Sequence, residues 1–213
     1  MNKGILLVLS GYLMWGCFPL YWALLNHVNP SEVLIHRMLW AVPVLFFLVH
    51  FKSSWKNNFK ASISSKKELV FLFITAILIT INWGGYIYAV NLGRVVEASM
   101  GYFLSPVINM IGGYIFFQER ISKLKQLAVF LATVGALYYV FSGDSFPWLG
   151  FLVGFTFSAY GIARKAMASS AVPGLYIETL ILLPFLLIFS LWFYTNYDIA
   201  FFNIDISTDI LLF

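Results

Sequence analysis

The sequence has 213 residues, of which 61% are hydrophobic and only 10% are charged. A soluble domain carries about 25% charged residues, so this composition excludes an ordinary soluble fold. The formal net charge of +4 does not indicate a nucleic-acid partner, because the lysines lie in short loops between apolar stretches. The composition therefore predicts an all-α polytopic membrane protein whose surroundings are the lipid bilayer.

The first apolar stretch, residues 4–25, is longer than the apolar region of a signal peptide, and no small-residue cleavage site follows it. We interpret it as a retained helix. Six further spans are predicted at residues 32–51, 69–91, 95–117, 124–141, 147–166 and 175–195. An eighth apolar segment begins near Ile206, and the sequence stops at Phe213. We therefore expect seven helices and the start of an eighth from a longer protein.

Eleven of the thirteen basic residues fall on alternate loops. They are Lys3, the five lysines of residues 52–67, the three basic residues of 120–125, and Arg164 with Lys165. Basic residues accumulate in cytoplasmic loops, so this pattern predicts a cytoplasmic N-terminus.

The last two spans resemble the first two. Trp15-Gly16 is echoed by Tyr160-Gly161, and aligning Pro43 with Pro184 places Arg37 at the position equivalent to Glu178. Because five spans separate the two copies, the second copy is inverted in the membrane. Inverted repeats are common in secondary transporters, which bind their substrate near the midplane between the repeats.

The span at 95–117 carries Glu97, Gly101, Ser105 and Asn109 at steps of four residues, so they share one helix face. Two interpretations remain open for this face. It is a seam where small residues let helices approach closely, or it lines a substrate path. Asn109 favours the path, because an amide at membrane depth needs polar partners.

A short turn joins this span to the span at 69–91, so the two are expected to lie side by side. Asn82 and Tyr86 share one face of the earlier span and are candidate path residues. Asn91, Arg94 and Glu97 lie at the turn. They form either a local ion pair facing water or a polar mouth that contains a coupling carboxylate.

Three further candidates for the substrate path are charged or titratable. His36 and Arg37 lie inside the second span, where a charged side chain is costly unless it faces water or snorkels outward. Glu178 lies in the first turn of the seventh span and is a capping carboxylate, a counter-charge to Arg164 or Lys165, or an intramembrane proton carrier.

The aromatic ring of Trp15 lies well inside its span and is a further path candidate, whereas most tryptophans lie near span ends, where an interfacial belt is typical. Glu119 and Arg120 are expected to fix the cytoplasmic end of the fourth span.

No enzyme motif is recognisable in the sequence. The three histidines, His27, His36 and His50, lack metal-ligand spacing, and no nucleophile elbow, zinc-protease motif or P-loop is present. The sequence therefore predicts neither catalysis nor a cofactor nor a metal site.

Several stretches together resemble the RarD branch of the EamA family, in the drug/metabolite transporter superfamily. They are SEVLIHRMLW, NWGGYIYAVN, VEASMGYFLSPVINMIGGYIFFQER, AYGIARKA and YIETLILLP. The resemblance implies ten helices in two inverted five-helix repeats, a first at residues 1–141 and part of a second at 142–213. It also implies a transporter of the bacterial cytoplasmic membrane that is linked to chloramphenicol sensitivity. The family pattern continues through three further helices.

Two hypotheses of different class follow. The first is a secondary transporter of small organic solutes or drug-like metabolites that works by alternating access. The alternative is a non-transporting membrane protein, an assembly partner or a sensor, in which the polar face of 95–117 binds another helix. The sequence does not indicate the substrate, the coupling ion or the oligomeric state.

Overall fold

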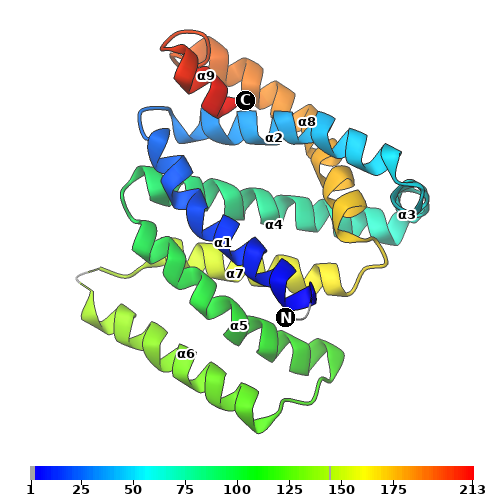
Figure 1. The fold of residues 1–213 in the computed structure, drawn as a ribbon, viewed down its shortest axis with the longest axis vertical. Coiled ribbons are helices and arrows are strands. Elements are labelled where there is room, and N and C mark those ends of the chain that lie inside the picture. Colours follow the sequence, from blue (N-terminus) through cyan, green and yellow to red (C-terminus); the bar gives the residue numbers. More distant parts are fainter. Residues whose placement is uncertain (1–2, 144) are drawn as a thin grey trace.

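The computed structural model describes residues 3–143 and 145–213, and every regular element in these residues is a helix (Figure 1). Seven of the helices correspond to the seven predicted spans within a few residues, which confirms the all-α membrane fold. The helices are α1 (Lys3–Leu24), α2 (Pro30–Phe51), α3 (Ser53–Ile63), α4 (Lys66–Asn91), α5 (Val95–Phe117), α6 (Lys123–Ser142), α7 (Trp148–Lys165), α8 (Ala171–Asn196) and α9 (Ile206–Leu212).

Six of the described helices are long and apolar enough to cross a membrane: α1, α2, α4, α5, α6 and α8. Helix α7 was also predicted as a span and is present, but it is not among the six. Its 18 residues include several glycines and hydroxyl side chains, and they end with Arg164 and Lys165. Because α7 packs between α4 and α5, it does not need the apolar surface of a lipid-facing helix.

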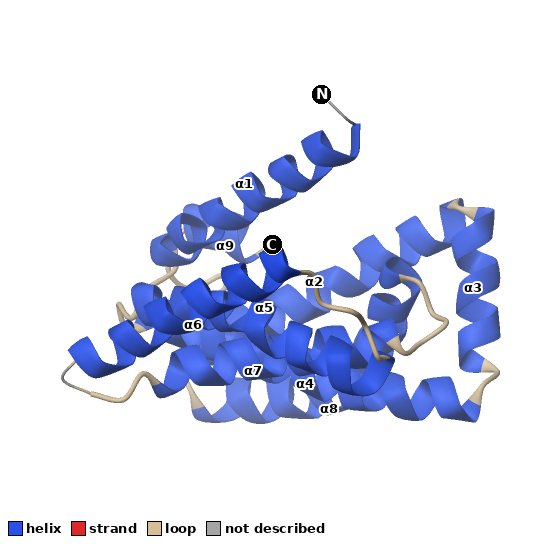
Figure 2. Ribbon diagram, turned by 90° about the horizontal axis from the view of Figure 1, so that it is seen from below, coloured by secondary structure: helices blue, strands red, loops and turns tan. Residues whose placement is uncertain are grey.

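The sequence did not predict α3, which occupies the lysine-rich loop before α4. This short helix runs across the ends of α2, α4 and α8 (Figure 2). One side of it is held to the protein, since Phe59 packs on the cluster of Leu45, Val49 and Tyr176. The Oδ1 atom of Asn58 also accepts a hydrogen bond from the backbone N–H of Ser170 at 2.9 Å.

The helices form a row in the order α8, α4, α7, α5 and α6, with α2 against α8 and α4 (Figure 1). Helix α1 contacts mainly α4, and its N-terminal half diverges from the bundle (Figure 2). We expected α4 and α5 to lie side by side. They meet at their turn, where Gly93 adopts a φ of 72°, but α7 has more extensive contacts with each of them than they have with each other.

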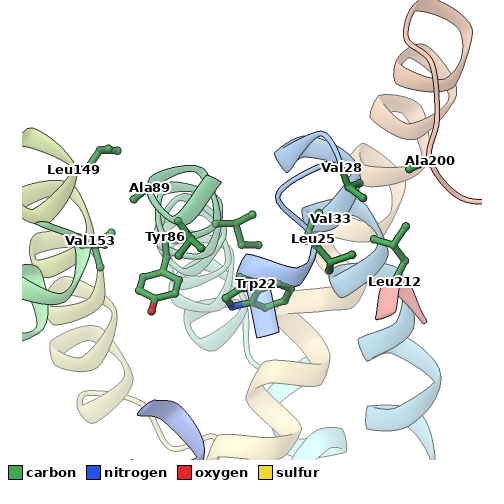
Figure 3. Packing of buried hydrophobic residues seen from close by; sticks show 13 residues of the cluster. Trp22, Leu25, Val28, Val33, Tyr86, Ala89, Leu149, Val153, Ala200 and Leu212 are labelled. Carbon is green, nitrogen blue, oxygen red and sulfur yellow. The ribbon is translucent and has the colours of Figure 1, made fainter. Parts of the chain in front are cut away.

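The largest apolar core joins both halves of the chain (Figure 3). It combines Trp22 and Val28 near the α1–α2 turn with Tyr86 of α4, Val153 of α7 and Ala200 from the segment after α8. These residues come from four separate stretches of sequence. Their burial therefore fixes the second half of the chain against the first at this end of the bundle.

The tightest helix contact is a glycine seam between α5 and α7, formed by Gly101, Gly150 and Gly154. A Cβ atom at Gly154 would lie 2.5 Å from the carbonyl oxygen of Gly101, and one at Gly150 would lie 2.5 Å from the carbonyl oxygen of Glu97. Real Cβ atoms do not approach backbone so closely. Only glycine permits this separation, which is how small residues act between membrane helices.

Replacing Gly154 by alanine should destabilise the bundle by about 1–3 kcal/mol, because the added methyl group collides with backbone that cannot rotate away. The matched control is Gly135→Ala in α6, where a Cβ atom meets nothing within 4 Å. That change should be neutral or slightly stabilising, because alanine favours helix over glycine. Thermal unfolding in detergent, followed by tryptophan fluorescence, compares the two. Equal melting temperatures of the two variants would contradict the requirement for glycine at the seam.

Candidate functional site

A cavity of about 480 Å³ lies between α1, α4, α5 and α7, and we call it the aromatic cavity. Its walls are mainly rings, and Ser99, Ser105 and Asn109 supply polar groups. Trp15 packs edge-on against Tyr102, with ring centroids 5.8 Å apart, and against Phe157, with centroids 5.5 Å apart. The aromatic lining residues are Tyr12, Trp15, Tyr86, Tyr102, Phe103 and Phe157.

A second cavity of about 480 Å³ lies between α5, α6 and α7, and we call it the basic cavity. Its charged lining residues are Glu119, Arg120, Lys125 and Lys165. Glu119 forms an ion pair with Lys165, and this contact lowers the pKa of the Glu119 carboxyl group. The aromatic and basic cavities share Pro106 and Asn109, so together they follow α5 from its middle to its C-terminal end.

Asn109 lies at this junction. Its side chain is exposed to the cavities, and within the described residues no hydrogen bond to it is found. Other members of the same helix face have another environment, because Gly101 lies in the glycine seam and the Ser105 hydroxyl is 3.4 Å from the carbonyl oxygen of Gly154. The polar face of α5 is thus a packing seam near its start and a cavity wall further along.

Arg37 of α2 is half-buried between two indole rings. Its guanidinium carbon lies 4.2 Å from the centroid of Trp83 and 5.3 Å from that of Trp22. Over the part of the chain that the structure describes, Arg37 makes neither an ion pair nor a side-chain hydrogen bond. It lines a smaller cavity of about 250 Å³, which we call the Arg37 pocket.

Asn82 and Glu178 lie in contacts between helices, and they line neither the aromatic cavity nor the basic cavity. The Asn82 amide donates to the carbonyl oxygen of Val153 at 2.8 Å and to the Thr156 hydroxyl at 3.2 Å, so it ties α4 to α7. Their role in a substrate path stays a prediction.

Glu178 accepts hydrogen bonds from the Thr75 hydroxyl at 2.7 Å and from the Tyr160 hydroxyl at 3.3 Å. Arg164 Nη1 is 3.7 Å from the same carboxylate. The fully buried Glu178 carboxylate therefore joins α4, α7 and α8. Its counter-charge is Arg164, which was one of the alternatives predicted from the sequence.

His36 is buried next to Arg37 but points elsewhere. Its Nε2 atom is 3.3 Å from the Tyr194 hydroxyl, and its ring packs on Phe201 with centroids 4.4 Å apart. The Nδ1 atom has no partner among the described residues. His36 therefore belongs to the packing of α2 against α8 and the segment after it.

The predicted mouth residues meet at the α4–α5 turn. Arg94 pairs with Glu97 at 2.6 Å, and Asn91 donates to the carbonyl oxygen of Asn26 at 3.0 Å. A hollow of about 370 Å³ beside the turn is lined by Arg94 and Glu97. The local ion pair is therefore present, whereas the role of these residues as the mouth of a substrate path stays a prediction.

Three glutamates in the first turns of helices bind the second half of the chain. Glu32 of α2 accepts from the backbone N–H groups of Ala200 and Phe201 at 2.9–3.0 Å. Glu97 of α5 accepts from Leu149 at 2.8 Å. Sequence reasoning missed this arrangement, although a glutamate at the start of an apolar span was a visible signal in each case.

The third is Glu68 of α4, which accepts from the N–H groups of Ala168 and Ser169 at 3.0 and 3.3 Å. Backbone donors outside regular helix need acceptors wherever water is scarce. We call Glu32, Glu68 and Glu97 the glutamate staples, because each holds a non-helical stretch or a helix start of the second half against the first half.

The sequence profile of the EamA-like transporter family matches residues 2–141. The chain belongs to the EamA-like transporter family. This match covers about two thirds of the chain, and it includes α5 and most of the walls of both cavities.

Relatives of this EamA chain occur in several bacteria. Protein RarD of Escherichia coli is 37% identical over 183 residues, which cover 86% of this chain and 62% of the relative. The uncharacterized transporter YojE of Bacillus subtilis is 35% identical over 185 residues, with the same coverage. The chloramphenicol-sensitive protein RarD of Pseudomonas aeruginosa is 30% identical over 194 residues, covering 90% and 65%.

The chain spans a little less than two thirds of the length of these relatives. The RarD-type resemblance found in the sequence is confirmed. No solved structure matches the chain.

Replacing Glu32 by glutamine tests the staples. The buried carboxylate accepts three contacts, whereas an amide presents one acceptor and turns an NH₂ group toward donors. We expect a loss of stability of about 1–3 kcal/mol. The control is Glu119→Gln, since Glu119 is exposed and its ion pair is screened by water. Thermal unfolding in detergent measures both variants, and a drop no larger for Glu32→Gln than for the control would contradict the role.

Proposed function

We propose that the chain forms the solute path of a secondary transporter that moves small organic or drug-like molecules by alternating access across the bacterial cytoplasmic membrane. The observation that carries the proposal is the shared wall of the two cavities at Pro106 and Asn109. Asn109 has no hydrogen-bond partner among the described residues and lies between the aromatic cavity and the basic cavity. Such a site suits a solute that has both apolar and polar parts. Family membership supports the same activity.

Alternating access requires that parts of the bundle move against each other around the site. The aromatic cavity is bounded by α1, α4 and α5 from the first half and by α7 from the second. We propose that the contact between α5 and α7 is the interface that moves, because it joins a helix of the first half to a helix of the second half beside the aromatic cavity.

We propose that the N-terminus lies in the cytoplasm. The basic loops lie at one end of the bundle, where Glu68 binds Ala168 and Ser169, and Asn58 binds Ser170. The positive-inside rule assigns that end to the cytoplasm. An N-terminal tag should be cut by protease in inverted vesicles and resist it in intact spheroplasts; the opposite pattern would reverse the orientation.

Thiol labelling distinguishes a path from a surface that binds another helix. In a Cys17→Ser background, Asn109→Cys should react with a water-soluble maleimide, because the side chain faces the cavities. Ala98→Cys, fully buried in the same helix, and Ile111→Cys, exposed on the outer surface of α5, should react far more slowly. Protection of Asn109→Cys to the level of Ala98→Cys would favour the assembly-partner alternative.

Replacing Asn109 by leucine should abolish transport and leave membrane insertion intact, because the junction loses its amide and gains an apolar branch. Flux of a solute panel that includes chloramphenicol, chosen because one relative is named for sensitivity to it, measures the effect in proteoliposomes. Ile111→Leu is the matched control and should transport normally. Normal flux in Asn109→Leu would remove this residue from the path.

A further inference from the structure

The Arg37 pocket is rich in hydrogen-bond donors and poor in acceptors. Besides Arg37, it is lined by Trp22 and Trp40, whose indole Nε1 atoms are buried and have no partner among the described residues. Trp22 is only 9% exposed. The Tyr21 hydroxyl, also in this pocket, is already committed to the carbonyl oxygen of Leu211. Arg37 therefore shares a pocket of about 250 Å³ with two indole side chains whose buried N–H groups have no acceptor among the described residues.

Among the described residues, no carboxylate forms an ion pair with Arg37. All five glutamates of the sequence have donors elsewhere: Glu32, Glu68 and Glu97 in the staples, Glu119 with Lys165, and Glu178 with Thr75 and Tyr160. A charged guanidinium inside a span is costly unless an anion or water compensates it. The tryptophan rings hold the cation in place and leave its N–H edge for another partner.

The surroundings place Arg37 beside the proposed solute path. Helix α1 borders both pockets, because Tyr21 and Trp22 line the Arg37 pocket and Trp15 and Pro19, one to two turns earlier, line the aromatic cavity. Trp22 packs in the same cluster as Tyr86, which lines that cavity too (Figure 3). At the far end of the path, the basic cavity holds three cations and one carboxylate. Cytoplasmic loops are basic in any case, so the basic cavity alone does not indicate an anionic solute. Arg37 does, because it lies inside a span.

We infer that the Arg37 pocket binds the carboxylate of the transported solute, and that the solute class is aromatic or amphiphilic organic monocarboxylates. The carboxylate accepts from the guanidinium in the planar two-bond arrangement that arginine favours. The apolar part of the solute then lies against the rings of the aromatic cavity. This inference rests on the proposed transport function and names the substrate class of that path.

The test is a pair of probes that differ in charge alone, 3-phenylpropionate and 3-phenylpropionamide. Their dissociation constants are measured at pH 7 by tryptophan fluorescence with the protein in lipid nanodiscs, since Trp22 and Trp83 flank Arg37. The acid should bind at least about tenfold more tightly than the amide, because a charge-assisted bond replaces a neutral one. Equal binding of both probes, or binding of neither, overturns the inference.

Variants assign the charge preference to Arg37. Arg37→Gln should weaken acid binding about tenfold and leave amide binding unchanged, whereas Arg37→Lys should give an intermediate value, because it keeps the charge and loses the planar fork. Lys60→Gln, which removes an exposed charge on α3, should change neither constant. A variant that fails to fold would lose both probes equally, so equal loss in Arg37→Gln counts against the inference.

The transport proposal fails separately. If flux of neutral solutes depends on Asn109 while acid and amide bind alike, the path stands and the carboxylate assignment is wrong. If the acid binds through Arg37 but Asn109→Cys is protected from maleimide, the pocket stands as a binding site and the path is wrong.

Discussion

The backbone contact between α5 and α7 is the constraint on which the rest of the structure depends. Gly101, Gly150 and Gly154 bring a helix of the first half and a helix of the second within carbonyl contact of each other. That approach draws α7 in between α4 and α5. Both cavities lie along α5 beside this contact, the aromatic cavity between α5 and α1 and the basic cavity between α5 and α6. A larger residue at the seam would therefore alter the cavities as well as the packing.

Acidic residues in this chain act mainly as acceptors for the chain's own donors. The glutamate staples lie in first helical turns, where the helix dipole also favours a negative charge. Each of them satisfies N–H groups from the other half of the chain. Because these carboxylates bind backbone N–H groups, they do not pair one for one with the basic side chains. Arg37 is a cation without an ion pair among the described residues, and it lies inside a span. Its environment therefore suits an anion from outside the chain.

The sequence predicted most of the helices but little of how they pack. Long apolar runs define spans by length alone, so the bounds of α5 agreed to the residue. Helix α3 was missed because it is short and polar, and it forms by docking Phe59 and Asn58 on other elements. The place of α7 between α4 and α5 could not be predicted, because contacts between distant segments leave no periodic signal in one sequence.

The two asparagines, Asn82 and Asn109, show the same limit at the site. Both lie inside apolar spans, and sequence reasoning treated them alike. In the structure the Asn82 amide donates hydrogen bonds to Val153 and Thr156, whereas Asn109 faces the cavities. The difference is set by α7, which covers one and leaves the other open. Residue type could identify candidates for a path, but only the packing of a helix from the second half separates a structural amide from one that is free to meet a solute.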